Sequence, residues 1–182
     1  MKLKLNELKI ENKLLTMNNF FTILLFSTLP FISFLQEENL KSLPSVSLKD
    51  LEGNLVNTAE MGFEGPVVIS FWATWCSPCK RELNAINDLY TDWQDETGVT
   101  LVAVSIDDEK TKNQVPVYVN GKAWDFKVLL DPNGDFKRAM GVNNVPHTFL
   151  INSKGEIVYT HNNYAPGDED HLYEEILKIV QQ

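Results

Sequence analysis

An apolar strand that leads directly into a helix is the feature that most constrains the fold of this sequence. Residues 67–72 read Val-Val-Ile-Ser-Phe-Trp, an almost unbroken apolar run that is typical of a central strand buried on both faces. Apolar residues at helical spacing follow, at Leu83, Ile86, Leu89, Tyr90 and Trp93. A buried strand that passes straight into a helix predicts an α/β domain built around parallel strands.

The rest of the sequence continues this alternation. Single strands are predicted at residues 99–106 and 126–130, and hairpins at residues 46–56 and 148–159. Helices are predicted at residues 109–120, 135–140 and 168–180. We therefore expect a mixed central sheet flanked by helices on both faces, with an added N-terminal hairpin.

The N-terminal segment differs in character from the rest. Residues 20–35 carry no charge and follow four lysines, at positions 2, 4, 9 and 13, which is the pattern of a secretory signal. The uncharged run reaches back to Leu14, giving 22 residues, so an uncleaved membrane anchor is an alternative. A buried core helix is disfavoured because Pro30 interrupts the run.

These features predict the domain organisation. Residues 1–36 would be a signal peptide or N-terminal membrane anchor that starts at Met1 or Met17, and residues 37–182 the folded domain, entered through a linker at 40–44. The protein would then lie in the periplasm or elsewhere outside the cytoplasm. A formal net charge of −9 over 182 residues argues against a nucleic-acid partner, because such binding needs a basic face.

The two cysteines, Cys76 and Cys79, lie between the buried strand and the helix. A bridge between residues three apart closes almost no loop and stabilises a fold little, so a redox role explains the pair better. At a helix start the free backbone N–H groups and the helix dipole stabilise a thiolate at Cys76, and Pro78 suits the first turn. We expect Cys76 to attack a partner disulfide and Cys79 to resolve the mixed disulfide.

The sequence at residues 71–80, Phe-Trp-Ala-Thr-Trp-Cys-Ser-Pro-Cys-Lys, closely resembles the active-site stretch of the thioredoxin superfamily. The nearest branch is that of the exported TlpA/ResA-like thiol-disulfide reductases. The resemblance covers about residues 44–182 and rests on Trp75, the cysteine pair, Glu82 and the dipeptide Val145-Pro146. It implies a thioredoxin-like fold and a thiol-disulfide oxidoreductase, expected to be a monomer without cofactor or metal.

The same resemblance implies partners and a contact surface. The protein would reduce disulfides of exported proteins, among them the cysteines of apocytochrome c, and would be kept reduced by a membrane electron donor. Substrate contacts would come from Trp75, Ser77, Pro78, Val145 and His147. The direction stays open from the sequence alone, although the lack of a long helical insertion argues against a dedicated oxidase.

Two further residues gain a catalytic interpretation from the resemblance. Pro146 would be the superfamily's cis-proline, packed against the disulfide; an ordinary trans proline at a strand start is the alternative. Glu82 lies one helical turn beyond Cys79, where a partly desolvated carboxyl could exchange protons with that sulfur. General thioredoxins use an aspartate on the central strand instead, and Ser70 stands at that position here. A solvated carboxylate at the helix start is the alternative for Glu82.

The sequence also departs from the family pattern. Asn84 stands where many relatives have a proline, and His147 stands where a threonine often follows the cis-proline. A protonated His147 could contact a partner or lower a cysteine pKa, and a polar edge position is the alternative. We expect His161 and His171 to be solvated, and the loop at residues 162–167 to lie near the partner groove.

Other functions fit the cysteine motif less well. A metal-delivery protein could use Cys76, Cys79 and His147, but such relatives space their cysteines farther apart. A thiol peroxidase would carry a single peroxidatic cysteine in a different motif. A non-enzymatic interaction module would not need both cysteines.

Overall fold

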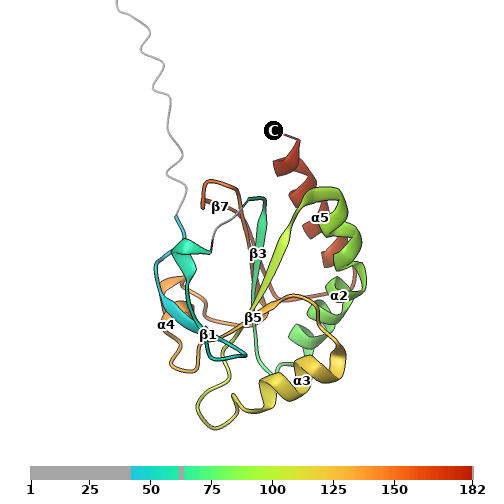
Figure 1. Ribbon diagram of the computed structural model, residues 1–182. Coiled ribbons are helices and arrows are strands. Elements are labelled where there is room, and N and C mark those ends of the chain that lie inside the picture. The colour runs from blue at the N-terminus through green and yellow to red at the C-terminus, as the bar shows by residue number, and fades with distance from the viewer. Residues whose placement is uncertain (1–41, 62–63, 182) are drawn as a thin grey trace, which may run out of the picture. The chain divides into compact units, whose positions relative to one another are not determined.

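The computed structural model describes residues 42–61 and 64–181, so the predicted signal or anchor at residues 1–36 lies outside the described part. A β-sheet forms the centre of the domain, with helices packed around it (Figure 1). The sheet has seven strands, in the order β2-β1-β5-β4-β3-β6-β7. The strands are β1 (Ser47–Asp50), β2 (Leu55–Asn57), β3 (Val67–Trp72), β4 (Thr100–Ser105), β5 (Lys127–Leu130), β6 (His147–Ile151) and β7 (Ile157–Asn162).

The sheet is mixed, as predicted. Strands β3, β4 and β5 pair in parallel, whereas β1 pairs antiparallel with both β2 and β5, and β6 pairs antiparallel with both β3 and β7. Every residue of β3 is buried, because the strand lies between β4 and β6 and is covered on both faces. The N-terminal β1–β2 hairpin is the predicted addition, with its turn at Gly53.

Within the described residues, four α-helices cover the sheet: α2 (Ser77–Thr97), α3 (Gln114–Lys122), α4 (Asp135–Ala139) and α5 (Asp168–Val180). A short 3₁₀ helix, η1, spans Thr58–Glu60. Alternate side chains of β3 enter two separate apolar clusters. Val68 and Trp72 pack with residues of α2, α3 and α5, whereas Ile69 and Phe71 pack with Phe136 of α4. Ser70 lies between Val68 and Trp72 in this alternation, so its side chain is on the face of the sheet that α2 covers.

Two sequence expectations need correction. The helix predicted at residues 109–120 begins only at Gln114, so that Pro116 is its third residue. A proline lacks the N–H that the helix interior requires, and the first turn is where that lack costs little, so the helix starts just before it. The described part of the predicted 40–44 linker is integrated into the fold, because Leu43 is buried and its N–H donates to the Gly155 carbonyl at 3.1 Å.

Candidate active site

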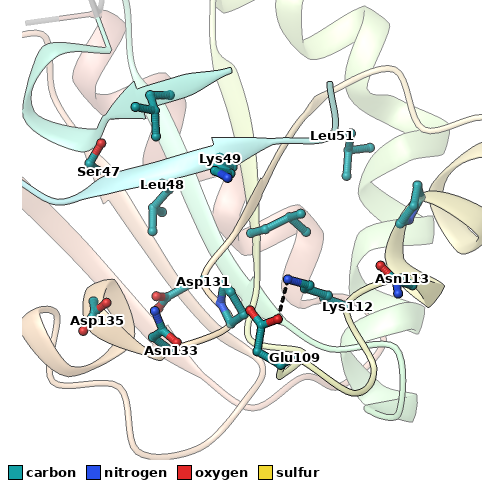
Figure 2. A pocket seen from close by; sticks show the side chains of 14 residues that line it. Ser47, Leu48, Lys49, Leu51, Glu109, Lys112, Asn113, Asp131, Asn133 and Asp135 are labelled. Carbon is teal, nitrogen blue, oxygen red and sulfur yellow. Dashed lines mark hydrogen bonds and ion pairs between the residues drawn. The ribbon is translucent and has the colours of Figure 1, made fainter. Parts of the chain in front are cut away.

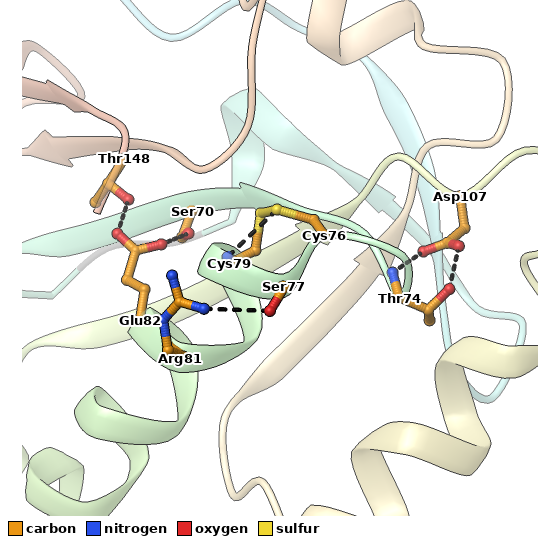
Figure 3. Close-up of a disulfide and its surroundings, with 9 residues drawn as sticks. All are labelled: Ser70, Thr74, Cys76, Ser77, Cys79, Arg81, Glu82, Asp107 and Thr148. Carbon is orange, nitrogen blue, oxygen red and sulfur yellow. Dashed lines mark hydrogen bonds between the residues drawn. A yellow bond between two sulfur atoms is a disulfide. The ribbon is translucent and has the colours of Figure 1, made fainter. Parts of the chain in front are cut away.

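Cys76 and Cys79 form a disulfide at the junction of β3 and α2, with their Cα atoms 5.4 Å apart (Figure 3). Cys76 is the N-cap of α2, and its sulfur accepts a hydrogen bond from the backbone N–H of Cys79 at 3.3 Å. Cys79 is fully buried and Cys76 is 5% exposed. A partner can therefore reach the pair only from the Cys76 side, and the helix N–H groups there favour a thiolate on that sulfur.

The turn between β3 and Cys76 is held by a buried carboxylate. Asp107 follows β4 and accepts hydrogen bonds from the Thr74 N–H at 2.8 Å and the Thr74 hydroxyl at 2.5 Å (Figure 3). The Ser105 hydroxyl donates to the same carboxylate at 2.9 Å. Asp107 was not among the site residues predicted from the sequence. Its signal was its position directly after a buried strand, because the carboxyl ends of parallel strands meet at one edge of a sheet.

Glu82 is buried, with 4% of its surface exposed, so the alternative of a solvated helix-start carboxylate is wrong. Its Oε1 accepts from the Thr148 hydroxyl at 2.7 Å and its Oε2 from the Ser70 hydroxyl at 3.1 Å (Figure 3). Loss of hydration raises the pKa of Glu82 to about 7, even though both hydroxyls stabilise the carboxylate. A carboxyl with that pKa gains and loses a proton near neutral pH, as a general acid–base group requires.

The peptide bond between Val145 and Pro146 is cis, as the resemblance implied. His147 opens β6 and is the register partner of Phe71 in β3. Pro146 therefore lies at the end of β3 from which the cysteine turn departs. The carbonyl of Pro146 accepts the Asn163 N–H at 2.9 Å, so the loop at residues 162–167 contacts this segment.

The remaining predicted contact residues divide by exposure. Trp75 is 61% exposed and Ser77 is exposed, whereas Pro78 is half-buried. The ring of His147 stacks on Phe149, with 4.4 Å between centroids, and its Nε2 lies 3.0 Å from the Thr160 hydroxyl. Burial lowers the pKa of His147, so the neutral ring is the stable form near pH 7. The protonated His147 considered from the sequence as one possibility is therefore disfavoured.

Of the other two histidines, one differs from expectation. His171 is exposed, as predicted, but His161 belongs to β7 and is half-buried, with Nε2 3.1 Å from Oδ2 of Asp168. The half-buried and exposed residues of β7 alternate, and His161 is at a half-buried position. The sequence did not predict this because the hairpin strand was expected to end at residue 159, before His161.

Two of the hollows on the surface of the described domain can be compared with the predicted site. One, of about 390 Å³, lies between the β1–β2 hairpin and the loops before α3 and α4, where Glu109 and Lys112 pair (Figure 2). It contains no predicted site residue. The other, a groove of about 600 Å³, is lined by Thr74 and Lys80 beside the cysteine turn and by Val117 and Tyr118 of α3. The groove is thus next to the redox pair.

Comparison with known proteins shows the family to which this chain belongs. The AhpC/TSA family model matches residues 40–160. Thiol-disulfide oxidoreductase ResA from Bacillus thuringiensis subsp. konkukian is 32% identical over 128 residues, which cover 69% of this chain and 72% of the relative.

Solved structures share the fold. A thioredoxin-like protein from Porphyromonas gingivalis is 48% identical with a TM-score of 0.69, covering 76% of this chain and 92% of the other. A structure from Chlorobium tepidum assigned as a thiol:disulfide interchange protein DsbE is 26% identical with a TM-score of 0.69, covering 78% and 96%. The chain therefore belongs to the AhpC/TSA family and, with its thioredoxin-like fold and C-x-x-C pair, to the thiol-disulfide oxidoreductases of the ResA type.

Proposed function

We propose that this oxidoreductase reduces disulfide bonds of exported proteins, with Cys76 as the attacking and Cys79 as the resolving cysteine. The observation that carries the proposal is the difference between the two sulfurs. Cys76 caps a helix and accepts an N–H, whereas Cys79 is fully buried one turn before a carboxyl whose pKa is about 7. One sulfur is thus suited to be a thiolate, and the other to keep its proton until a base removes it.

The reaction then proceeds in two exchanges. The Cys76 thiolate attacks a substrate disulfide, forming a mixed disulfide and releasing one substrate thiolate, which takes a proton from solvent. Glu82 removes the proton of Cys79, and the Cys79 thiolate attacks the Cys76 sulfur. The Cys76–substrate bond breaks, the second substrate thiolate is protonated, and the Cys76–Cys79 disulfide remains. Two electrons pass from the protein dithiol to the substrate.

Substrate contact would come from the surface around Cys76. Trp75, Ser77, Pro78, Val145 and His147 would bind the segment that carries the target disulfide, and Pro146 would shape that surface. The exposed indole of Trp75 and the adjacent groove at Thr74 and Lys80 give such a segment apolar and polar contacts. The backbone of Pro146 is held by the hydrogen bond that its carbonyl accepts from the Asn163 N–H.

An extracytoplasmic location follows from the basic and apolar pattern of residues 1–36, as a cleaved signal or as a membrane anchor. Within residues 42–61 and 64–181, no helix is both long and apolar enough to cross a bilayer. Outside the cytoplasm a reductase needs a source of electrons, so a membrane protein would re-reduce the disulfide. Cysteines of apocytochrome c are one substrate of this class.

The test is the reduction potential of the Cys76–Cys79 pair, measured by equilibration with glutathione, together with reduction of insulin disulfides. We expect a potential in the reducing range and insulin reduction that is lost in Cys76→Ser and in Cys79→Ser. A strongly oxidising potential, with insulin left intact, would overturn the reductase direction while leaving the oxidoreductase chemistry in place.

A further inference from the structure

A water-sized cavity lies on the side of Glu82 that faces the surface helix α5. Its volume is about 10 Å³, measured as room for the centre of a water molecule, and one molecule fits. The polar groups that line it are Glu82, Thr148, Tyr159, His161, Asp168 and Glu169. A cavity with this many polar walls meets the conditions for holding an ordered water.

At its inner end the cavity meets a carboxyl that cannot reach bulk solvent directly. Glu82 is 4% exposed, and the neighbouring Cys79 is fully buried. The two carboxyl oxygens of Glu82 accept hydrogen bonds from the hydroxyls of Ser70 on β3 and Thr148 on β6. A proton that Glu82 takes from Cys79 must nevertheless leave before the next cycle, and the cavity offers it a way out.

At its outer end the cavity meets a histidine–aspartate pair. Nε2 of His161 lies 3.1 Å from Oδ2 of Asp168, and the two side chains are 35% and 27% exposed. The Ala165 N–H donates to the same Oδ2 at 2.7 Å, which fixes the carboxylate. The pair therefore has one side toward the cavity and another toward solvent. The Ala165 N–H holds the pKa of Asp168 below its ordinary value, so Asp168 stays a carboxylate that orients the imidazole of His161.

The other ionisable groups around the cavity are unsuited to relay a proton. Burial and Glu169 raise the pKa of Tyr164 to about 12, so its hydroxyl stays protonated and donates to Glu169 at 2.9 Å. The pKa of Tyr159 is also raised by burial. Glu169 is further engaged by the Gly167 N–H at 3.0 Å. The negative charges of Asp168 and Glu169 help to hold the proton of Glu82.

We propose that His161 and Asp168 form the solvent end of a proton path that connects Glu82 to bulk water through one water molecule in this cavity. The proposal rests on the proposed role of Glu82 as the base for Cys79. When the Glu82 O–H bond breaks, the proton passes to the cavity water, which gives up one of its own to the His161–Asp168 pair. The pair releases it to solvent. The path runs in reverse when the disulfide is reduced and Cys79 is protonated again.

The test is a single-turnover measurement of disulfide formation. The reduced full-length protein is mixed with excess oxidised glutathione, and the resolving step is followed by rapid acid quench and mass spectrometry. Near neutral pH we expect His161→Ala to slow that step about tenfold or more, because positioned proton transfer contributes strongly to such steps. Added imidazole should restore the rate. The matched control is His171→Ala, a change at an exposed histidine of α5 outside the cavity, which should leave the rate unchanged.

Two further variants separate the possible failures. Asp168→Asn keeps an oxygen for the Ala165 N–H but removes the negative charge beside His161, so it should also slow resolution. Glu82→Gln tests the base itself. If Glu82→Gln is slow while His161→Ala and Asp168→Asn resolve at the wild-type rate, the path is wrong and the role of Glu82 stands. If Glu82→Gln is also unaffected, the proposed base is wrong. A slow His161→Ala that imidazole does not restore would assign His161 a structural role and overturn the path.

Discussion

Glu82 shows how burial and hydrogen bonding compete at a single residue. Two hydroxyls donate to its carboxylate, which by themselves would lower the pKa, yet loss of hydration dominates and the pKa rises from 4.5 to about 7. A raised pKa means that the folded protein holds this proton more tightly than the unfolded chain does. The carboxyl therefore favours the folded state below pH 4.5, and this contribution is lost as the pH rises through about 7.

Glu82→Gln should remove this pH dependence. In the oxidised wild-type protein, the pKa difference makes the free energy of unfolding fall by about 3 kcal/mol between pH 4.5 and 7, and no further above that range. Urea denaturation at several pH values measures the effect as the difference between wild type and variant. Glu174→Gln, at an exposed position of α5, is the control and should keep the wild-type slope. Equal slopes in wild type and Glu82→Gln would contradict the burial of a titrating carboxyl.

Residue spacing in the sequence identified Cys76, Cys79 and Glu82, because all three lie within two turns of one helix start. The partners that tune them come from far along the chain. Asp107 is 33 residues from Thr74, and Thr148 is 66 residues from Glu82. Such contacts depend on strand order and register, which local patterns do not determine. The contacts of these positioning groups could therefore not be predicted, although the place of Asp107 directly after a buried strand was visible in the sequence.

At the scale of elements, the junction between β3 and α2 sets the position of Cys76. The strand is buried on both faces, and the loop that leaves it is tied to the end of β4 by Asp107. The Cys76 N–H also donates to the Ala73 carbonyl at 3.0 Å, which tightens the turn. Cys76 is thus positioned by contacts with two adjacent strands as well as by its own helix.

Thr74→Val tests the hydrogen bond between the Thr74 hydroxyl and Asp107. Valine has nearly the shape of threonine but cannot donate to the buried Asp107, and losing a hydrogen bond to a charged group costs about 1–3 kcal/mol. Thermal and urea unfolding should show that loss. Thr91→Val, at an exposed position of α2, is the matched control and should change stability far less. Identical losses for the two variants would show that the contact with Asp107 contributes nothing specific.

Element prediction succeeded where periodicity was strong and failed where tertiary contacts decide. The helix predicted at residues 168–180 coincides with α5, and the buried strand at 67–72 with β3, because their patterns are regular. The predicted start of α3 was wrong because Pro116 belongs to the first turn of the helix, which therefore begins only at Gln114. Leu43 was assigned to a linker because nothing local indicates that it contacts Gly155.

At the scale of the domain, the sheet separates two apolar clusters, and only one of them contains the cysteines. One contains the cysteines with residues of α2, α3 and α5, and the other contains Phe71, Phe149 and Phe136. The ring centroids of Phe71 and Phe136 lie 5.2 Å apart. The second cluster is on the face of the sheet opposite α2, so it supports the fold without contacting the redox pair.

Phe136→Ala should therefore reduce stability without altering the cysteine chemistry. Truncating a fully buried phenylalanine costs about 3–5 kcal/mol, which denaturant unfolding would show. The reduction potential of the variant should equal that of the wild type under conditions where both are folded. Leu55→Ala, at a 71% exposed side chain, is the control for loss of apolar surface. A shifted potential in Phe136→Ala would mean that the two clusters are coupled.

The assignment of Cys76 as the attacking cysteine is tested most directly by covalent trapping of the exchange intermediate. Reduced Cys79→Ser and Cys76→Ser proteins are each mixed with a disulfide-bonded substrate protein, and the mixed disulfide is quantified by mass spectrometry under non-reducing conditions. We predict that Cys79→Ser accumulates a stable adduct through Cys76, because the attacking thiolate is present and the resolving sulfur is absent. Cys76→Ser should form almost none, since Cys79 is fully buried. Adduct formation through Cys79 at an equal or higher rate would contradict the assignment of Cys76 as the attacking cysteine.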